Sequence, residues 1–302
     1  MRRIPALSLL LLLLLLLPVL SQCSHEPPSN FDQSWRERLY APTMMTRIDD
    51  DWIIVDAWHH RIIHTDSFSF DLNDWEVFTE DAAGPHSVAT DGDLYLYDDT
   101  GRGALQAARE VSRIGDFFVV ETNTIPAMGS RPHRVVYDEA TDRFFTIAST
   151  SQEIFRLRNE NGEAVVEDRH HAAFLNGAYS RSLTIVDDRM FIVSSQGRIT
   201  ETTYRDGSYE VIRTYDLPAR FEAMIDMYKS PNGWYYLSAK PRGFGRARSL
   251  DEFVTGEYED LYSKVALKGT PYYLTQVDGR IIVPFQEGSN GILSVREDGE
   301  GG

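Results

Sequence analysis

A strand–turn–strand unit recurs along most of this chain, and its period restricts the fold more than any other feature. The unit is found in "DDDWIIVDAWHH", "DGDLYLYDDTG", "ATDRFFTIAST", "VDDRMFIVSSQ", "PNGWYYLSAK" and "VDGRIIVPFQ". The residue before each second strand is, in order, Asp51, Asp93, Arg143, Arg189, Gly233 and Gly279. These positions are separated by 42, 50, 46, 44 and 46 residues. A period of this length leaves room for two further strands in each unit.

Six such units favour an all-β fold, a six-bladed β-propeller of four-stranded blades that spans residues 41–297. One blade cannot bury both of its faces, whereas radial packing between two neighbours buries both and closure of the ring leaves few exposed edges. The alternative is a β-sandwich, in which turns recur about every 8–12 residues without a longer period. We also predict one short helical insert near residues 249–264, with Ser249 as its N-cap.

The first unit resembles the NHL repeat. Its segment "VDAWHHRII", residues 55–63, matches the NHL pattern of an apolar residue, Asp, two residues and then Asn/His-His-Arg-Ile, and "YDDTGRGAL" is a weaker match. The resemblance implies a six-bladed propeller that is distantly similar to gluconolactonase-type and paraoxonase-type propellers. It leaves the activity open, because such folds include hydrolases, lyases and binding scaffolds. Since His59 and His60 fall inside the pattern, we expect them to have a structural role.

Residues 1–22 are typical of an export signal. Arg2 and Arg3 precede an apolar run at residues 6–20, which at about 15 residues is shorter than the ~20 needed to span a bilayer. Cleavage before Gln22 would release a secreted protein, whereas "LSQC" resembles a bacterial lipobox that would lipidate Cys23. Cys23 is the only cysteine and so has no intramolecular disulfide partner, which favours lipidation. We therefore expect an exported protein, either a periplasmic or cell-surface lipoprotein or a secreted form.

The segments that flank the repeat are short. Residues 23–40 are expected to be a tether, in which residues 31–40 could supply a strand that closes the ring or could form a helix, and residues 298–302 a flexible tail. Loss of Arg2 and Arg3 with the signal leaves 28 basic residues against 46 acidic ones, a net charge of −18. Such a surface repels phosphate backbones. The expected partner is a small molecule or a protein segment, not nucleic acid, and membrane contact is expected only through the lipid anchor.

Polar side chains recur where the innermost strand of each unit begins. Alignment of the units on Pro42, Pro85, Pro132 and Pro271 gives a ring of residues at the mouth of the central channel. In unit order this ring is Thr43, His86, His133, Arg181, Met224 and Tyr272. Imidazole, guanidinium and phenol groups can together bind a carboxylate or phosphate. The alternative is structural, because Pro at the start of a strand loses no ladder donor and the histidines could simply cap the channel.

A metal site is a further possibility at this mouth. His86 and His133 belong to adjacent units, so we expect them to face one cavity, where they could ligate a divalent metal or serve as a general base. Zinc requires a third ligand, and Asp98 or Glu222 is the candidate. Asp98 belongs to a second aligned ring with Asp56, and both could instead accept backbone N–H groups in turns. Calcium is implied by the gluconolactonase and paraoxonase resemblance, but it prefers several oxygen ligands, and the ring offers mainly nitrogen donors.

The chain has no GxSxG, HExxH or paired CxxC motif. Arg242, Arg246 and Arg248 form a local basic patch, which would either attract an anion at the channel mouth or be a solvated loop. We therefore predict a protein that binds a small ligand or a partner segment at the channel mouth. The alternative is a metal-dependent hydrolase of lactonase or esterase type, with zinc or calcium in the channel.

Overall fold

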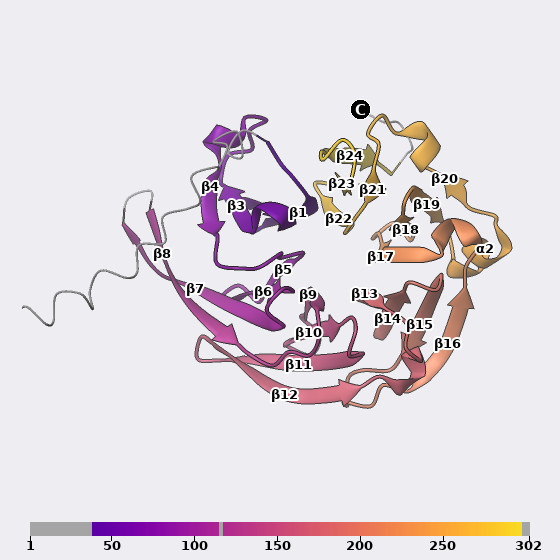
Figure 1. Cartoon of the computed structure of the whole chain (residues 1–302), viewed down its shortest axis with the longest axis horizontal. Helices are drawn as coiled ribbons and strands as arrows, with labels where there is room; N and C mark the ends of the chain where they lie inside the picture. The colour runs from indigo at the N-terminus through magenta and orange to yellow at the C-terminus, as the bar shows by residue number, and fades with distance from the viewer. Residues whose placement is uncertain (1–37, 115–116, 298–302) are drawn as a thin grey trace, which may run out of the picture.

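Six sheets of four strands surround a central axis in the computed structural model, which describes residues 38–114 and 117–297 (Figure 1). The strands within each sheet are antiparallel, and in the first five blades they follow chain order from the axis outward. The prediction of an all-β, six-bladed propeller is confirmed.

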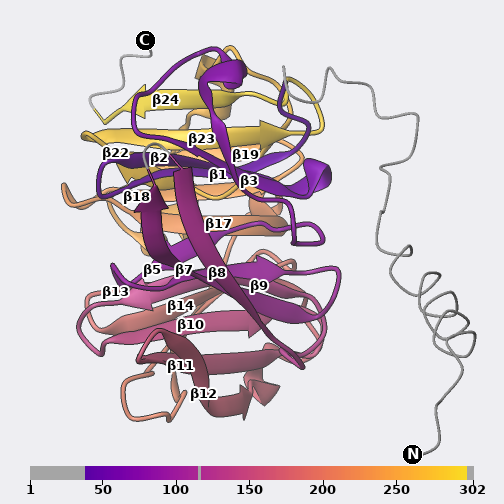
Figure 2. The same ribbon diagram turned by 90° about the vertical axis from the view of Figure 1, so that its left-hand side faces the viewer.

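The first three blades take up the chain as far as residue 171. Blade one contains β1 (Pro42–Ile48), β2 (Asp51–Asp56), β3 (Arg61–Thr65) and β4 (Glu76–Thr79), with 3-10 turns η2 (Ala57–His59) and η3 (Leu72–Asp74). Blade two contains β5 (Val88–Thr90), β6 (Tyr95–Asp99), β7 (Ala104–Ile114) and β8 (Phe117–Ile125). Blade three contains β9 (Pro132–Asp138), β10 (Arg143–Ala148), β11 (Glu153–Glu160) and β12 (Glu163–His171). The hairpin of β7 and β8 extends outward from the ring (Figures 1 and 2).

The last three blades follow the same plan. Blade four, which η4 (Ala173–Leu175) precedes, contains β13 (Ser180–Val186), β14 (Arg189–Ser194), β15 (Arg198–Thr202) and β16 (Val211–Asp216). Blade five contains β17 (Ala223–Lys229), β18 (Tyr235–Lys240), β19 (Gly243–Ala247) and β20 (Glu259–Asp260). The 3-10 turn η5 (Ala219–Phe221) precedes this blade, the helix α2 (Leu250–Thr255) lies between β19 and β20, and the 3-10 turn η6 (Tyr262–Lys264) follows β20. Blade six contains β21 (Thr270–Pro271), β22 (Thr275–Val277), β23 (Arg280–Gln286) and β24 (Ile292–Arg296).

The hydrophobic core is divided among the contacts between neighbouring blades. Phe144 and Phe145 are consecutive in β10 and fully buried, and because strand side chains alternate in direction they face opposite sides of the sheet. Phe144 packs in the cluster shared with blade two, and Phe145 in the cluster shared with blade four. Each blade therefore depends on both of its neighbours to bury its two faces.

Blades one and six close the ring through their inner strands. The Tyr273 amide donates to the Thr43 carbonyl at 3.1 Å, and the Thr275 hydroxyl donates to the Met45 carbonyl. Met45 and Val277 pack in one cluster between these two blades. In blade six, β21 and β22 both pair with β23, and β24 pairs with the other edge of β23.

Several predictions for the termini lie wholly or largely outside the described residues. They are the signal at residues 1–22, lipidation of Cys23, the tether and the tail at 298–302, and all stay predictions. Of the possible closing strand at residues 31–40, only 38–40 are described, and these form no strand. Within the described part of the chain, no helix is both long enough and apolar enough to cross a membrane.

The predicted helical insert is confirmed as α2. Ser249 is its N-cap and accepts a hydrogen bond from the Glu252 amide at 3.2 Å. The Glu252 carboxylate accepts one from the Arg248 amide at 2.8 Å.

We expect Ser249→Ala to lower the free energy of unfolding by about 1 kcal/mol, because the cap satisfies a helix N–H that has no other partner. Urea denaturation measures the change, and Ser195→Ala, in the turn after β14, should stay within about 0.5 kcal/mol of the parent.

Candidate functional site

The two ends of the central axis differ in the side chains that they carry. Inner strands begin at the end that holds His86 and His133, here the histidine end, and finish at the hairpin end, where a turn leads into the second strand. Register shifts near the start of four inner strands, β1, β9, β13 and β17, mark β-bulges. A bulge changes the direction of the side chains around it. In β9 the bulged residue is Arg134, at a φ of 47°, and both His133 and Arg134 are buried.

Three aromatic rings from different blades form a column at the histidine end. The His86 and His133 rings stack with centroids 4.6 Å apart and planes inclined by 18°. Tyr272 stacks on His86 at 5.5 Å. The exposed fractions of His86, His133 and Tyr272 are only 9%, 1% and 2%. The column therefore forms a buried floor, and a ligand would meet it from the outer side.

Cationic side chains surround this column. The Arg181 guanidinium lies 4.8 Å from the Tyr179 ring centroid and that of Arg131 lies 5.9 Å from it. The Tyr179 hydroxyl lies 3.4 Å from His133 Nε2, which places both arginines next to the histidines. Lys240 adds a third positive charge, although its ammonium pairs with Glu287 at 2.8 Å. The histidine end is thus locally basic in a strongly acidic protein.

Both histidines are held neutral at pH 7. Burial, followed by the charges of His133, Arg181, Arg131 and Lys240, lowers the pKa of His86 well below its ordinary value of 6.5. Burial lowers the pKa of His133 to about 3, assisted by Arg181 and Arg131 and opposed by backbone hydrogen bonds. A neutral imidazole with so low a pKa is a weak general base. It can still accept or donate a hydrogen bond, and the buried Nδ1 of His86 has no partner among the described residues.

Other polar groups at this end are also unsatisfied. Within the described part of the chain, Arg181 Nε and the hydroxyls of Ser149 and Ser180 are buried and have no hydrogen-bond partner. Ser149 follows β10 and Ser180 begins β13, and the Ser180 amide donates to the Ser149 carbonyl at 3.4 Å. Buried polar groups are normally satisfied by protein, water or ligand. Their concentration beside the column indicates that something polar occupies this region.

Four of the five predicted binding residues come together, and one does not. His86, His133, Arg181 and Tyr272 meet at the histidine end. Thr43 is fully buried. Its hydroxyl donates to the Val55 carbonyl at 3.3 Å, and its carbonyl takes part in ring closure. Met224, at the same repeat position, is buried in the core between blades four and five.

The aspartates of the second aligned ring accept hydrogen bonds from backbone amides. Asp98 accepts the amides of His86 and Ser87 at 2.9 and 2.7 Å and the hydroxyls of Ser87 and Thr100 at 2.7 and 2.9 Å. Burial outweighs these bonds and raises its pKa to about 6. Asp56 instead accepts the Ala41 amide at 2.8 Å. Asp99 accepts the equivalent Ala83 amide at 2.9 Å, so the match to Asp56 in blade two is Asp99 rather than Asp98.

The NHL-like segment is explained by the contacts of Asp56. Its carboxylate lies 2.6 Å from His59 Nδ1 and 3.1 Å from the Arg61 guanidinium. His60 Nδ1 accepts the Gly84 amide at 2.9 Å, which ties blade one to the start of blade two. In this segment the Asp, His and Arg residues hold the corner between strands, in agreement with the structural role expected for His59 and His60.

The donor set at the histidine end does not fit zinc or calcium. Stacked rings direct their ring nitrogens into separate, nearly parallel planes, so His86 and His133 cannot both approach one ion at the roughly 2.1 Å of a zinc–nitrogen bond. Asp98 is saturated by backbone and hydroxyl donors, and Glu222 is exposed. No group of three or more His, Cys, Asp or Glu side chains in residues 38–114 and 117–297 is placed to hold a metal ion.

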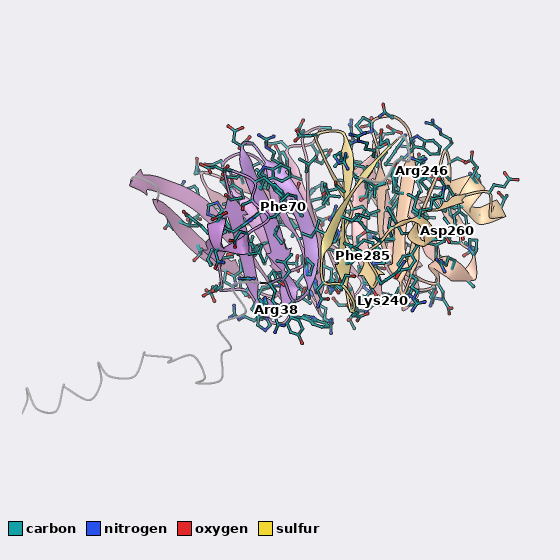
Figure 3. All side chains as sticks on the ribbon, turned by 90° about the horizontal axis from the view of Figure 1, so that it is seen from above. Arg38, Phe70, Lys240, Arg246, Asp260 and Phe285 are labelled. Carbon is teal, nitrogen blue, oxygen red and sulfur yellow. The ribbon has the colours of Figure 1, made fainter. Side chains whose placement is uncertain are left out.

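The predicted basic patch does not stay together: Arg242 lies in the turn after Lys240, whereas Arg246 and Arg248 make local contacts elsewhere. Arg246 pairs with Glu259 at 2.6 Å and stacks on Trp234. Arg248 also stacks on Trp234, with its guanidinium 3.7 Å from the ring centroid. Figure 3 shows Arg246 and Lys240 at opposite ends of the ring. Arg246 and Arg248 therefore make local contacts and are not part of the histidine end.

Sequence reasoning missed Tyr179, Arg131 and Lys240 at the site. Arg131 immediately precedes Pro132 and Lys240 ends β18, so both could have been found by their nearness to aligned positions. Tyr179 lies one residue before β13, in a blade that lacks the Pro used for alignment, and no sequence signal identified it.

Comparison with known proteins finds similarity in fold only. No protein-family model and no curated protein sequence matches it. The structure resembles two proteins provisionally assigned as 6-phosphogluconolactonases, from Bacteroides uniformis and Bacteroides fragilis. They share 14% identity with it over 83% and 84% of this chain and 79% and 80% of theirs, with TM-scores of 0.58 and 0.59. A periplasmic gluconolactonase from Pseudomonas aeruginosa shares 11% identity over 69% of this chain and 67% of its own, at a TM-score of 0.50. The protein is therefore a six-bladed propeller with lactonase-named structural neighbours, and at these identities the similarity extends to the fold alone.

Proposed function

We propose that the protein binds a small anionic molecule at the histidine end. A phosphate or carboxylate group would be held by Arg181 and Arg131, above the floor formed by His86, His133 and Tyr272, while Lys240 stays paired with Glu287. The observation that carries the proposal is the gathering of these two guanidinium groups around buried polar atoms that have no partner in the described part of the chain. Hydrogen bonds between ionised partners are the strongest that such groups can make.

The low pKa of the histidines supports binding in preference to catalysis by a histidine base. The Arg181 and Arg131 charges that depress the pKa of His133 are the same charges that attract an anion. A bound anion would offset them, so both imidazoles would become easier to protonate when the site is occupied. The two Bacteroides neighbours support the same ligand class, because their assigned name implies a phosphorylated sugar lactone as substrate.

The test uses 6-phosphogluconate, gluconate and inorganic phosphate as probes in isothermal titration calorimetry. We expect 6-phosphogluconate to bind and Arg181→Gln to weaken it by at least about tenfold, the equivalent of about 1.4 kcal/mol. Arg198→Gln removes the same charge from an exposed pair with Asp216 and should leave the affinity unchanged. Equal affinities in the two variants, or no binding of any of the three probes, would refute the proposal.

The gluconolactonase and 6-phosphogluconolactonase neighbours favour lactone hydrolysis as a second candidate. The fold likeness is its support, and the same cations would position an anionic lactone. The assay follows hydrolysis of 6-phosphogluconolactone and gluconolactone above the spontaneous rate, before and after addition of Ca²⁺ or Zn²⁺. Turnover that Arg181→Gln abolishes would favour the enzyme, and spontaneous rates under all conditions would exclude it.

A further inference from the structure

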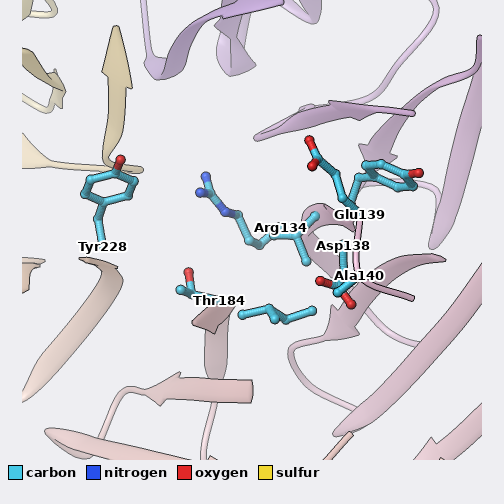
Figure 4. Close-up of a pocket in the computed structure, with 9 residues that line it drawn as sticks. Arg134, Asp138, Glu139, Ala140, Thr184 and Tyr228 are labelled. Carbon is cyan, nitrogen blue, oxygen red and sulfur yellow. The ribbon is translucent and has the colours of Figure 1, made fainter. Parts of the chain in front are cut away.

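A second, unassigned hollow opens at the hairpin end of the axis, opposite the histidines. Its volume is about 740 Å³, and its lining comes from the ends of three inner strands: β9, β13 and β17. Val136, Ala140 and Ile185 give it an apolar wall, and Tyr228 forms part of another side. Figure 4 shows the Arg134 side chain reaching into the space between Tyr228 and Glu139.

Arg134 is a buried cation whose hydrogen bonds are largely unmade. Its side chain is only 9% exposed, and its Nε and Nη1 atoms have no partner among the described residues. The guanidinium lies 4.7 Å from the Tyr273 ring centroid. A guanidinium has five N–H donors arranged as a fork that matches a carboxylate. Water or a ligand must therefore complete the contacts of Arg134.

The nearest carboxylate does not meet this need. Asp226 Oδ2 is 3.9 Å from Arg134 Nη2, beyond hydrogen-bond distance. Asp226 is fully buried, and its oxygens already accept the Ser182 hydroxyl at 2.6 Å and the Leu274 amide at 2.8 Å. Asp226 therefore links blades four, five and six and leaves the Arg134 fork available to the hollow.

The rim of the hollow has the opposite charge. Asp138 and Glu139 lie in the lining, and Glu139 is exposed. Asp187 and Asp188, in the turn after β13, are exposed at the same end, but they pair with Lys229 and Arg205, so the charge of the rim rests on Asp138 and Glu139. A ligand that carried only negative charge would be repelled by this rim before it reached Arg134. A ligand with an anionic inner end and a cationic outer end would be attracted to both parts.

We propose that the hollow at the hairpin end binds an apolar α-amino acid. The carboxylate would be held by Arg134, the ammonium group would lie toward Glu139 and Asp138, and the side chain would pack against Val136, Ala140 and Ile185. This site is separate from the anion site at the histidine end, so either proposal can fail without the other.

The test compares three matched probes by isothermal titration calorimetry on the folded protein. L-Leucine carries both charges, L-leucinamide lacks the carboxylate and 4-methylpentanoate lacks the ammonium group. We expect L-leucine to bind and each analogue to bind at least about tenfold more weakly. Equal binding of leucinamide would refute the contact with Arg134, and equal binding of 4-methylpentanoate would refute the role of the rim. Absence of binding by L-leucine at about 10 mM would refute the proposal as a whole.

Variants assign the site to its residues. Arg134→Gln should weaken the binding of L-leucine at least about tenfold. Arg134→Lys should weaken this binding as well, because a point charge cannot replace the bidentate fork of the guanidinium. Glu139→Gln replaces an exposed side chain, so it should preserve folding. It should weaken the binding of L-leucine and improve the binding of 4-methylpentanoate. Arg198→Gln, which removes a guanidinium from an exposed pair with Asp216, is the matched control and should leave the binding of L-leucine unchanged. Loss of L-leucine binding in that control, or its persistence in Glu139→Gln and Arg134→Lys, would overturn the assignment.

Discussion

Asp56→Ala is expected to lower the free energy of unfolding by about 3–5 kcal/mol, the range for breaking a buried ion pair from one side. Asp56 is fully buried and Arg61 is 3% exposed, so removal of the carboxylate takes away the counter-charge that Asp56 gives to a buried guanidinium. The Ala41 amide and His59 lose their acceptor as well. Chemical denaturation followed by tryptophan fluorescence measures the change.

The control is Glu80→Ala, which removes one carboxylate from an exposed position in the same blade and should stay within about 0.5 kcal/mol of the parent. Asp56→Asn should fall between the two variants, because the amide oxygen can still accept the backbone N–H while the charge opposite Arg61 is lost. A loss below about 1 kcal/mol in Asp56→Ala would contradict the role of this residue as the anchor of the NHL-like corner.

The second large effect is a dependence of stability on pH that comes from His133. Its folded pKa is about 3 against an ordinary value of 6.5. Between these values the unfolded chain binds a proton that the folded protein does not, so stability falls as the pH falls, by up to about 1.4 kcal/mol per pH unit. We expect the stability of the parent relative to His133→Gln to fall by about 2 kcal/mol between pH 6.5 and about pH 4.5.

Urea denaturation of both proteins across this range measures the difference. Asp98 acts in the opposite direction, because its pKa is raised to about 6 and its folded form therefore holds a proton more readily. This contribution is present in both proteins and cancels in the difference. His171→Gln, at an exposed position on β12, is the matched control for the removal of one imidazole. A stability difference between the parent and His133→Gln that does not change with pH would show that the His133 imidazole is not held neutral by burial.

Much of the architecture could be predicted from the sequence, because the patterns that indicate it lie within short segments of the chain. The alternation of apolar and polar residues, the acidic and glycine turns and the spacing of about 45 residues act within single hairpins. Ser249 was recognised as an N-cap for the same reason, since a cap and its helix lie within a few residues of each other. The aligned ring also placed four of the expected residues together, because blades repeat their geometry around the axis.

The alignment failed for two members of the predicted ring and for one aspartate. Thr43 and Met224 share the repeat position of the histidines, yet one supports ring closure and the other lies in the core. Register shifts lie beside both residues, but they also lie beside His133 and Arg181, which do reach the site, so the repeat position alone does not decide which side chains face the axis. In blade two, Asp99 makes the contact that the alignment assigned to Asp98. A bulge depends on the pairing of two strands, and nothing in the residues of one strand alone specifies it.

The sequence by itself determined six blades of four strands, one capped helix, and a pair of histidines at equivalent points of adjacent blades. Tertiary structure alone decided what those histidines meet. His86 stacks on Tyr272, which is 186 positions away in the chain, and the ring must close before these residues touch. Closure also buries both imidazoles and brings Arg181 beside His133, whereas Arg131 already lies next to Pro132 in the chain. Burial, with the charges of these two arginines, lowers the pKa of His133 to about 3. The charge state of the site is thus mainly a consequence of burial and of Arg181 from another blade, and neither of these is encoded in the short Pro-His segments themselves.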